Sequence, residues 1–475
     1  MKTRNVYYFS STRFVRCSKD NHLQQQSQST PHTFTKKKKM MMMMSSSHVP
    51  TTLDGSYGEG GGQILRNSIS YATLLGIPLQ INKIRAGRSQ PGLKAQHIAS
   101  LRLPTQLVTT TGRTVDLLKG DTLHSTSITY TPPTQKDSET NEAAPGERHV
   151  TMEIGTAGSI CLLLQASLPV ALFGTTPIRF TLGGGTNATM APQYDYWYEV
   201  FLPMLQSQCG ISPDAVTARV VRRGYYPKGG GQVDVRVSKP LTSIQTLQPV
   251  RLTERGEPIS LRVRAYHAGD RWTRQHATQM TRAARDILQR HQPRLLLPVD
   301  DISEEIVTEH DAVGSGMGII LIIETSTGCL LAGSALCDKR VNTPVKVGTA
   351  AANELVQTWM DGGCVDEWLQ DNMIIYMALA KGTSRMITGS LSLHTRTAIW
   401  VAEKLTAARF TVQRLDVVTV DDDAQPSKRL KGDPRDKNRQ PVPEAEYGEQ
   451  GRVMGRHLIE CVGIGLHGRA WGRGI

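Results

Sequence analysis

The chain has 475 residues, of which 39% are hydrophobic and 20% charged, which is typical of a globular protein with a sizeable core. Residues such as Gln165, Pro169 and Glu324 interrupt the longest apolar runs, so the sequence excludes a membrane span of roughly 20 apolar residues. The formal net charge is +13, and the first 50 residues supply most of it, with nine Lys or Arg against Asp20 alone. The mild positive charge of the remainder suits a polyanion such as RNA, although basic faces are more often simply solvated.

The cysteines are scattered along the chain with no CxxC pair, and several lie within apolar runs. This distribution is typical of a reducing compartment and gives no zinc-binding pattern. The seven positions are Cys17, Cys161, Cys209, Cys329, Cys337, Cys364 and Cys461.

Residues 1–52 are rich in Ser, Gln and Lys and lack apolar periodicity, so we expect a disordered basic leader. An organellar transit peptide would have this composition, but so would an extension outside the protein proper, because the run from Met40 to Met44 offers other starts. A second polar stretch, 421–450, is also expected to be disordered. Its basic clusters suit a nuclear import signal and a solvated loop about equally.

Strand-like and helix-like segments alternate between these two stretches, which predicts an α/β fold. IPLQINKIRAG has a strand pattern, GLKAQHIASLRLPTQLV a helical one, and AVTARVVRRGYYPKGGGQVDVRV the pattern of a hairpin. Triple glycines recur at 60–62, 183–185 and 229–231, and the first and third are each followed by Gln. The recurrence points to a repeated β and α unit, although glycine runs alone are weak evidence for one.

One block of the chain, 240–346, carries strands and a helix of its own, and we expect a smaller inserted α/β domain there. The repeated pattern resumes after this block. The large domain is therefore expected to consist of residues 53–239 and 347–420, completed by a final strand at 456–466.

The stretch SYGEGGGQILR places Glu59 among glycines just before an apolar pattern of helical spacing, which predicts a helix from Gly62 to a stop at Gly76. A glycine loop that leads into a helix N-terminus presents free N–H groups to a phosphate. The stretch nevertheless matches neither GxGxxG nor the P-loop motif. Glu59 is therefore open to two interpretations, an acid that holds a divalent cation against phosphates or a solvent-exposed turn residue.

Two further segments carry polar residues where a ligand could bind. In KIRAGRSQPGLKAQH, Arg85 and Arg88 lie three residues apart on a tight loop and are followed by Gln96. Arginines held in this way suit bidentate phosphate binding, and a plain surface loop is the alternative. In GTAGSICLLLQ, Gln165 is an amide within an apolar helix pattern. A buried amide needs hydrogen-bond partners, which either a ligand or the core can provide.

The stretch LSLHTRTAIWVAEKL has apolar residues at helical spacing, and His394 falls just before this helix or in its first turn. The positive end of a helix dipole disfavours an imidazolium, so the ring would stay neutral with a free nitrogen lone pair. A nucleophile needs such a lone pair. Spacing alone does not separate a nucleophile from a capping or surface histidine, so both interpretations stay open.

Taken in order, these and other segments resemble one family, the RNA 3′-terminal phosphate cyclases, and above all its eukaryotic-type form. The similarity covers nearly all of residues 53–414 and the strand HLIECVGIGL. Two of the segments, RRGYYPKGGGQ and PGLKAQH, are long and specific. The matching stretches are GEGGGQILR, IRAGRSQPGLKAQH, TAGSICLLLQ, GGTNATMAPQYDY, RRGYYPKGGG, ERG, ETSTGCLLAGS, VDEWLQDNMIIYMALA and LHTRTAIWVAE.

The resemblance implies an α/β fold with a large domain of three repeated units, each a sheet packed on two helices, and a smaller inserted α/β domain. It also implies an ATP-dependent, ligase-type enzyme that uses Mg²⁺ or Mn²⁺ and acts in three steps. A histidine attacks the α-phosphorus of ATP, which forms histidinyl-AMP and releases pyrophosphate. The adenylate passes to the 3′-phosphate of an RNA, and the neighbouring 2′-hydroxyl then displaces AMP to leave a 2′,3′-cyclic phosphate.

The functional residues of the family fall on matching positions of this chain. Its nucleophile falls on His394 and its metal-binding acid on Glu59. Its ATP-contacting positions fall on Gln165, Pro192, Trp368, Asp371 and Asn372. Its phosphate-site residues match Arg66, Arg85, Arg88 and Gln96. Trp368 and Asn372 replace the Tyr and Gln that the family more often has, so we expect altered adenosine contacts with the chemistry retained.

Other functions predict different residues. The cyclase-like proteins of ribosome assembly share the fold but lack the histidine nucleophile, which LHTRTAIW retains. A plain RNA-binding protein would not need Glu59 or the segment around Asp371, and the glycine and arginine motifs do not follow those of the enolpyruvyl transferases, whose fold has similar units. The expected partners are ATP and an RNA with a 3′-phosphate, with no membrane, and a homodimer is left open. The nucleus is the expected location, with an organellar leader as the alternative.

Overall fold

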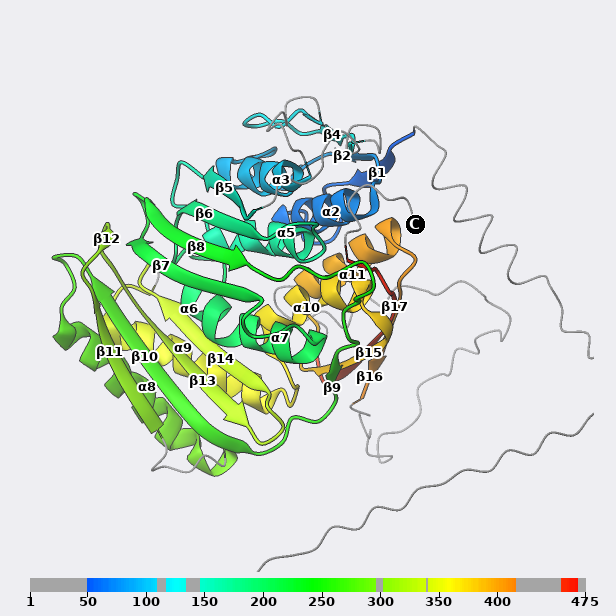
Figure 1. The fold of residues 1–475 in the computed structure, drawn as a ribbon. Helices are drawn as coiled ribbons and strands as arrows, with labels where there is room; N and C mark the ends of the chain where they lie inside the picture. Colours follow the sequence, from blue (N-terminus) through cyan, green and yellow to red (C-terminus); the bar gives the residue numbers. More distant parts are fainter. Residues whose placement is uncertain are drawn as a thin grey trace, which may run out of the picture. The chain divides into compact units, whose positions relative to one another are not determined.

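The computed structural model describes residues 49–108, 117–133, 146–295, 302–338, 341–415 and 454–468. The expected insert with its basic clusters and almost all of the expected leader lie outside these residues, so both stay predictions. The α/β fold class is confirmed, because strands and helices alternate along the described chain (Figure 1). None of the helices in these ranges is both long and apolar enough to cross a membrane.

Three of the sheets are each accompanied by helices, as expected for three repeated units (Figure 1). The first sheet, in the order β1-β2-β4-β3, comes with two helices and is built from β1 (Thr51–Asp54), α2 (Gly62–Leu75), β2 (Leu79–Asn82), α3 (Ala95–Leu107), β3 (Leu118–Lys119) and β4 (Ile128–Tyr130). The second sheet, in the order β12-β7-β8-β6-β5, is built from β5 (Arg148–Glu153), α5 (Ile160–Leu172), β6 (Ile178–Gly184), the helical segment α6 (Tyr194–Tyr196), η1 (Trp197–Phe201) and α7 (Leu202–Cys209), then β7 (Val216–Gly224), β8 (Gly231–Val237) and β12 (Ala312–Val313). The third sheet, in the order β16-β17-β15-β9, is built from β9 (Arg251–Leu252), α10 (Glu367–Leu379), β15 (Lys381–Thr388), α11 (Leu393–Leu405), β16 (Arg409–Arg414) and β17 (His457–Ile464).

The fourth sheet has its own helices and its own apolar core. Its order is β11-β10-β13-β14, and its elements are β10 (Pro258–Ala268), α8 (Arg274–Leu295), β11 (Ile302–Glu309), β13 (Gly316–Thr325), β14 (Leu330–Leu336) and α9 (Pro344–Met360). Side chains of α8 and α9 pack with those of β10 and β13 in one apolar cluster, whereas Ile320 and Ile322 of β13 belong to the larger core. The short strand β12 leaves this region to pair in parallel with β7 of the second sheet. Where the chain divides into domains stays a prediction.

Helices α2, α3, α5, α10 and α11 pack against one another. Every residue of α2 is buried, because other helices and the first sheet cover it on all sides. Its predicted bounds are confirmed: α2 begins at Gly62 and ends at the left-handed cap Gly76, with φ of 64°. The predicted hairpin is confirmed as well, because β7 and β8 pair antiparallel.

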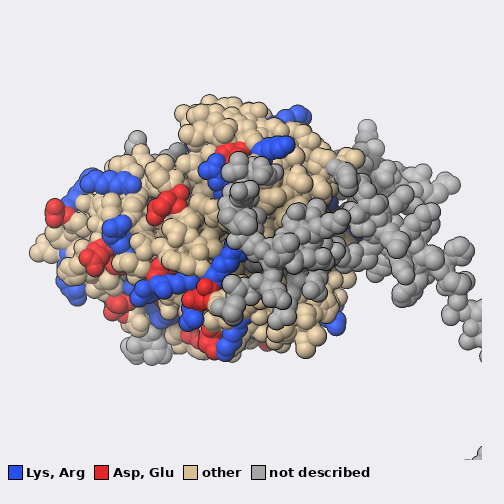
Figure 2. Space-filling view, turned by 45° about the horizontal axis from the view of Figure 1, so that its top comes forward, with Lys and Arg blue, Asp and Glu red and all other residues tan. Residues whose placement is uncertain are grey.

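Charged side chains of both signs are interspersed on the face of the molecule in Figure 2. Neither Lys and Arg nor Asp and Glu gather there into a broad patch of one sign. The mild positive charge of the folded part is therefore spread out on this face, and binding of a polyanion depends on individual cationic groups.

Candidate functional site

Arg66, the fifth residue of α2, lies at the centre of a buried polar cluster. It is only 6% exposed, and it donates from Nε to Oε1 of Gln165 at 2.5 Å and from Nη2 to Oε1 of Gln63 at 3.0 Å. Burial lowers the pKa of Arg66, and the nearby carboxyl groups of Glu59 and Asp371 oppose that change. The fold thus holds a cation, fixed by two amides, at the positive end of a helix.

The two amides of this cluster are not fully paired. Gln165 donates from Nε2 to Oε1 of Gln63 at 3.3 Å. A core residue is thus among the partners of this buried amide, and contact with a ligand stays open as well. Nε2 of Gln63 is buried and has no hydrogen-bond partner within the described part of the chain. Buried donors are almost always satisfied, so this one is free to pair with a ligand oxygen.

Glu59 lies between an arginine and a histidine that come from distant parts of the chain. Its Oε1 accepts from Nη2 of Arg88 at 3.0 Å, and the same nitrogen donates to the main-chain oxygen of Glu59 at 2.8 Å. Its Oε2 is buried, has no hydrogen-bond partner among the described residues, and lies 3.7 Å from Nδ1 of His394. One carboxylate oxygen is therefore paired, and the other is directed at the predicted nucleophile.

His394 is the second residue of α11, so its predicted place in the first turn of a helix is confirmed. The helix begins there because Oγ of Ser392 accepts from the main-chain N–H of Thr395 at 3.1 Å, which caps the first turn. The side chain of His394 is 42% exposed. A small molecule can therefore reach the ring while the helix holds its backbone in place.

Close packing of the glycine loop against α11 brings Glu59 to His394. The main-chain N–H of Glu59 donates to Oγ1 of Thr397 at 3.3 Å. Gly58 has φ of 58°, and a Cβ on it would lie 2.5 Å from Oγ1 of Thr397. Only glycine fits both the left-handed backbone and this approach, which is a physical reason for glycine at this point in the loop.

The predicted ATP-contacting residues of α10 form a small hydrogen-bonded group. Nδ2 of Asn372 donates to Oδ1 of Asp371 at 2.8 Å and to the main-chain oxygen of Trp368 at 2.6 Å. Burial raises the pKa of Asp371 to about 8, and Arg66 opposes the rise. Without a ligand, Asp371 is therefore largely protonated at neutral pH, and its carboxyl group can both donate and accept a hydrogen bond.

The other predicted residues lie nearby to different degrees. Oε1 of Gln96 accepts from the main-chain N–H of Ser159 at 2.7 Å, which joins the start of α3 to that of α5. Arg85 has φ of 56°, and its Nε is buried without a partner in the described residues. Pro192 is buried just before α6, and within the described ranges no hydrogen bond or ion pair joins it to the cluster.

His97 belongs to the same group but carried no assignment from the sequence. Burial first, then Arg66 and Arg85, lower the pKa of His97 to about 3, so the ring is neutral. Its Nδ1 accepts from the main-chain N–H of Lys94 at 3.0 Å, which leaves the proton on Nε2. A Cβ on Gly62 would lie 3.2 Å from that nitrogen, so His97 borders the start of α2. The sequence contains one indication of His97, because this residue ends the specific stretch PGLKAQH. No spacing rule, however, assigns it a role.

The donor set for a metal ion is small. Among the described residues, no three His, Cys, Asp or Glu side chains converge so that they could hold a metal ion. The unpaired, buried Oε2 of Glu59 nevertheless fits one ligand position of a divalent cation. Mg²⁺ commonly keeps several waters and uses one or two carboxylates together with substrate phosphates, so a single acid suits a cation that arrives with ATP.

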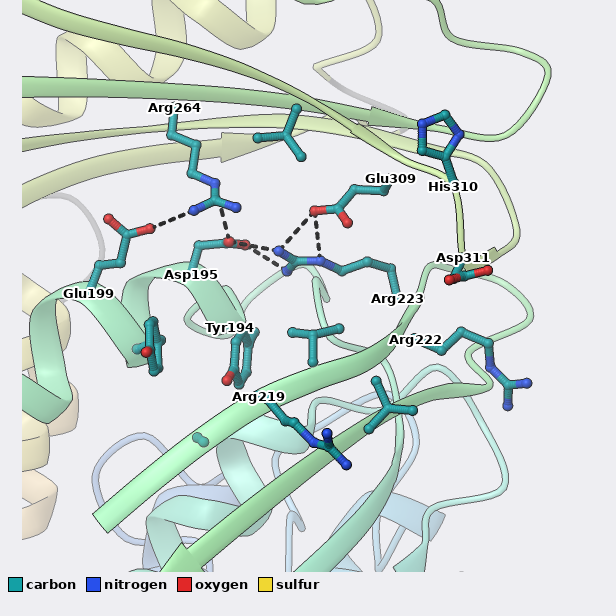
Figure 3. Close-up of a pocket in the computed structure, with 15 residues that line it drawn as sticks. Tyr194, Asp195, Glu199, Arg219, Arg222, Arg223, Arg264, Glu309, His310 and Asp311 are labelled. Carbon is teal, nitrogen blue, oxygen red and sulfur yellow. Dashed lines mark hydrogen bonds and ion pairs between the residues drawn. The ribbon is translucent and has the colours of Figure 1, made fainter. Parts of the chain in front are cut away.

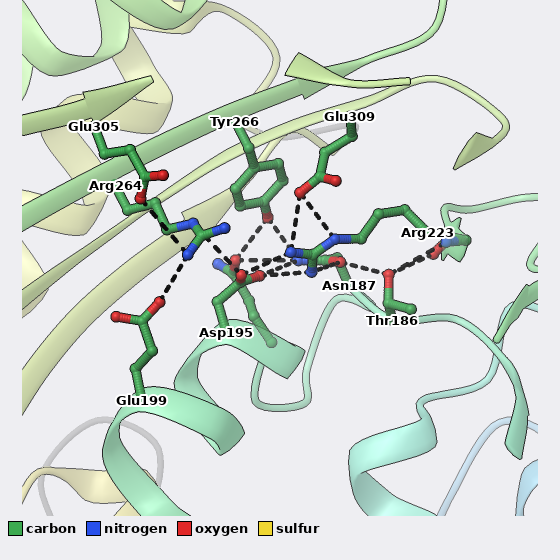
Figure 4. Close-up of polar contacts among 11 residues, drawn as sticks. Thr186, Asn187, Asp195, Glu199, Arg223, Arg264, Tyr266, Glu305 and Glu309 are labelled. Carbon is green, nitrogen blue, oxygen red and sulfur yellow. Dashed lines mark hydrogen bonds and ion pairs between the residues drawn. The ribbon is translucent and has the colours of Figure 1, made fainter. Parts of the chain in front are cut away.

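A cavity of about 500 Å³ lies elsewhere, between β7, the helical segment that begins at α6, and the fourth sheet (Figure 3). None of the predicted site residues lines it. Beside it, Arg223 donates from Nη1 and Nη2 to both carboxylate oxygens of Asp195 at 2.8 Å and from Nε to Glu309 at 3.0 Å (Figure 4). Burial alone would raise the pKa of Asp195, but Arg223 holds it below its ordinary value. These charges are paired with one another, which is typical of a structural network.

Comparison with known proteins identifies the family. A sequence model described as RTC, RNA 3'-terminal phosphate cyclase, matches residues 57–412. The chain is 37% identical to "Probable RNA 3'-terminal phosphate cyclase" of Dictyostelium discoideum, over 76% of this chain and 78% of the relative. It is 37% identical to the RNA 3'-terminal phosphate cyclase of Drosophila melanogaster, over 76% of this chain and 92% of the relative. The corresponding protein of Pyrobaculum neutrophilum is 31% identical, over 76% of this chain and 94% of its own length. The chain therefore belongs to the RNA 3′-terminal phosphate cyclase family.

Proposed function

We propose that this protein is an RNA 3′-terminal phosphate cyclase that uses ATP to convert a 3′-terminal phosphate of RNA to a 2′,3′-cyclic phosphodiester. The observation that carries the proposal is the position of His394, accessible in the first turn of α11 with Glu59 beside its Nδ1. Family membership supports the overall reaction, and the relatives above are named for it. The covalent histidinyl-AMP route is our proposal for this chain.

In the first step, Nε2 of His394 would attack the α-phosphorus of ATP. Nδ1 faces the carboxylate of Glu59 at 3.7 Å, which favours the tautomer with the proton on Nδ1 and leaves the lone pair on Nε2. A nitrogen–phosphorus bond forms while the bond from phosphorus to the pyrophosphate oxygen breaks. Arg66 and the amide of Gln63 would contact phosphate oxygens from the start of α2, where negative charge grows in the transition state. Glu59 would hold Mg²⁺ or Mn²⁺, whose charge would neutralise the pyrophosphate leaving group.

In the later steps, an oxygen of the RNA 3′-phosphate would attack the adenylate phosphorus and the His394 nitrogen would leave. The neighbouring 2′-hydroxyl oxygen would then attack the terminal phosphorus of the RNA and expel AMP, with loss of the hydroxyl proton. Arg85 and Arg88 would bind the RNA phosphate from the loop beside Glu59, because arginine pairs with phosphate in bidentate geometry. The hydrogen-bonded group of Asp371, Asn372 and Trp368 would contact the adenosine.

The decisive experiment labels the protein with AMP. Purified protein with α-labelled ATP and Mg²⁺ should acquire label that is stable to alkali and labile to acid, as expected of a phosphoramidate. His394→Ala should abolish the label. His310→Ala is the matched control, because His310 is an exposed histidine beside the cavity and should label normally. Persistent labelling of His394→Ala, or none of the native protein, would falsify the covalent route.

A second assay separates the enzyme from a non-catalytic RNA-binding or ribosome-assembly protein. An RNA with a 3′-phosphate should be converted to the cyclic product in the presence of ATP, and the same RNA with a 3′-hydroxyl should not. Glu59→Ala should slow AMP transfer to the protein more than it slows the later steps, because pyrophosphate departs only in the first. Binding of both RNAs without any conversion would favour the non-catalytic alternative.

A further inference from the structure

Two aromatic rings stack at the junction between the glycine loop and α11. The ring of Tyr57 lies on the indole of Trp400 with centroids 4.1 Å apart and planes inclined by 15°. Tyr57 belongs to the loop that carries Glu59, and Trp400 belongs to the helix that begins beside His394. The stacked pair is therefore built from the same two segments as the predicted catalytic pair.

Helix α11 sets the distance between the stacked pair and His394. Along the helix, contacts to the loop come first at His394, then at Thr397, and then at Trp400. Six residues of α-helix span about 9 Å along the axis. A nucleotide whose phosphate lies at His394 therefore has its own base, or the base of its neighbour, within reach of these rings.

The outer surface of Tyr57 is open. Tyr57 is 46% exposed although its ring stacks on Trp400, so a large part of the residue stays accessible. Trp400 in turn packs partly against the large apolar core, which anchors the pair. A rigid aromatic ring backed by a second ring presents a flat apolar surface with little conformational entropy to lose on binding.

Cationic groups flank the same junction. Arg88, which is paired with Glu59, and Arg85 come from the loop after β2. Aromatic rings beside cationic side chains are the usual means by which proteins hold single-stranded nucleic acid, because bases stack and phosphates pair with the cations. The predicted adenosine contacts lie instead on α10, so the stacked pair is not needed for the base of ATP.

We propose that Tyr57, supported by Trp400, is a stacking platform for a nucleobase at the 3′ end of the RNA substrate. The inference rests on the proposed function, and it names the site at which the substrate's last or second-to-last base binds. The platform would raise affinity for single-stranded ends whatever their sequence, because every base has a π face.

Tyr57→Ala tests the platform. The KM for a short RNA with a 3′-phosphate should rise about 5- to 150-fold, the range of base stacking on one aromatic ring, while Tyr57→Phe should restore most of the loss. The rate of AMP transfer to the protein without RNA should be retained, which also reports that the variant is folded. Tyr198→Ala is the matched control: Tyr198 is also 46% exposed and stacked on a tyrosine, but it lies beside the cavity and should leave the KM unchanged.

Abasic substrates identify the partner of the ring. With RNAs that lack either the last or the second-to-last base, the difference between native protein and Tyr57→Ala should disappear for one of the two. A difference that persists with both, or a KM that does not rise at all, overturns the platform. A rise in the KM for ATP in the first step instead would assign the ring to adenine. These outcomes differ from failure of the proposed function itself. In that case the native protein would form neither the labelled adduct nor the cyclic product.

Discussion

Two buried regions of this protein differ in the groups to which a nearly buried arginine is bound. Around Arg223, the guanidinium and the carboxylates of Asp195 and Glu309 satisfy one another. Arg66, by contrast, donates to the uncharged amides of Gln165 and Gln63. Both regions contain a nearly buried arginine, so burial of charge alone does not distinguish them.

This difference distinguishes polar groups that stabilise the fold from polar groups that can bind a ligand. Groups that pair with one another need no ligand, and the network around Arg223 joins β7 to the helix start at Asp195 and to the end of β11 (Figure 4). An arginine bound only to uncharged amides can still pair with a ligand phosphate. By this criterion the candidate site lies at the start of α2, although the paired network lines a cavity of about 500 Å³ (Figure 3).

The largest expected effect on stability follows from breaking the paired network. Arg223→Ala leaves the carboxylate of Asp195, which is 3% exposed, without its main partner. Loss of one partner of a buried ion pair costs about 3–5 kcal/mol of unfolding free energy. Urea unfolding of native and variant protein measures this cost, and the activity of the folded fraction should change little. A variant as stable as the native protein would show that the pair is not a structural one.

Arg66→Lys tests the region around Arg66, where we expect activity to change more than stability. The substitution keeps the charge but loses the fork that contacts Gln63 and Gln165, so activity should fall about 10²- to 10³-fold, as when one donor to a developing charge is removed. The change in stability should be smaller, on the order of 1–3 kcal/mol for lost buried hydrogen bonds. Steady-state kinetics and unfolding measured side by side distinguish the two effects. Equal losses of activity in Arg66→Lys and Arg223→Ala would remove the contrast between the regions.

The protonation of Asp371 gives a pH-dependent test. Burial raises its pKa from 3.8 to about 8 in the folded protein, so the folded state binds the proton more tightly than the unfolded chain does. The stabilisation from this proton is complete below about pH 4 and is lost as the pH rises through about 8. Asp371→Asn should therefore weaken the fall in stability between pH 5 and pH 9, measured by urea unfolding. Parallel curves for native and variant protein would contradict a buried, protonated Asp371.

The smallest effect is expected at Arg219, which lies on the same strand as Arg223. In its ion pair with Asp234 the Arg219 side chain is 69% exposed, and Asp234 has Arg179 as a second partner. Exposed pairs contribute about 0–1 kcal/mol. Arg219→Ala should leave thermal unfolding and cyclase activity close to those of the native protein, which makes it the matched control for Arg223→Ala. A large loss of stability would mean that the network extends to the surface.

Local patterns predicted much of the fold. The apolar spacing after Gly62 and the glycine at Gly76 gave the bounds of α2, because a helix face and a left-handed cap are local properties. The hairpin of β7 and β8 follows in the same way from a glycine turn between two strand patterns. Pairing of β12 with β7 was not predicted, because a two-residue parallel strand has no periodicity of its own. The ion pairs of Arg223 were missed for the same reason, since its partners are distant in sequence.

The sequence by itself determined which residue types are available for chemistry and in what local setting: an acid among glycines, a histidine at a helix start, and arginines on a tight loop. These follow from spacing and backbone preference, which act over a few residues. Only the tertiary structure decided that Glu59 and His394 face each other at 3.7 Å, that Arg66 is buried with two amides, and that His97 joins them. The reason is physical: burial, pairing and pKa depend on groups that the packing of α2, α10 and α11 brings together from opposite ends of the chain. The family resemblance already assigned Glu59 and His394 to one site, but the contact between them is seen only in the structure.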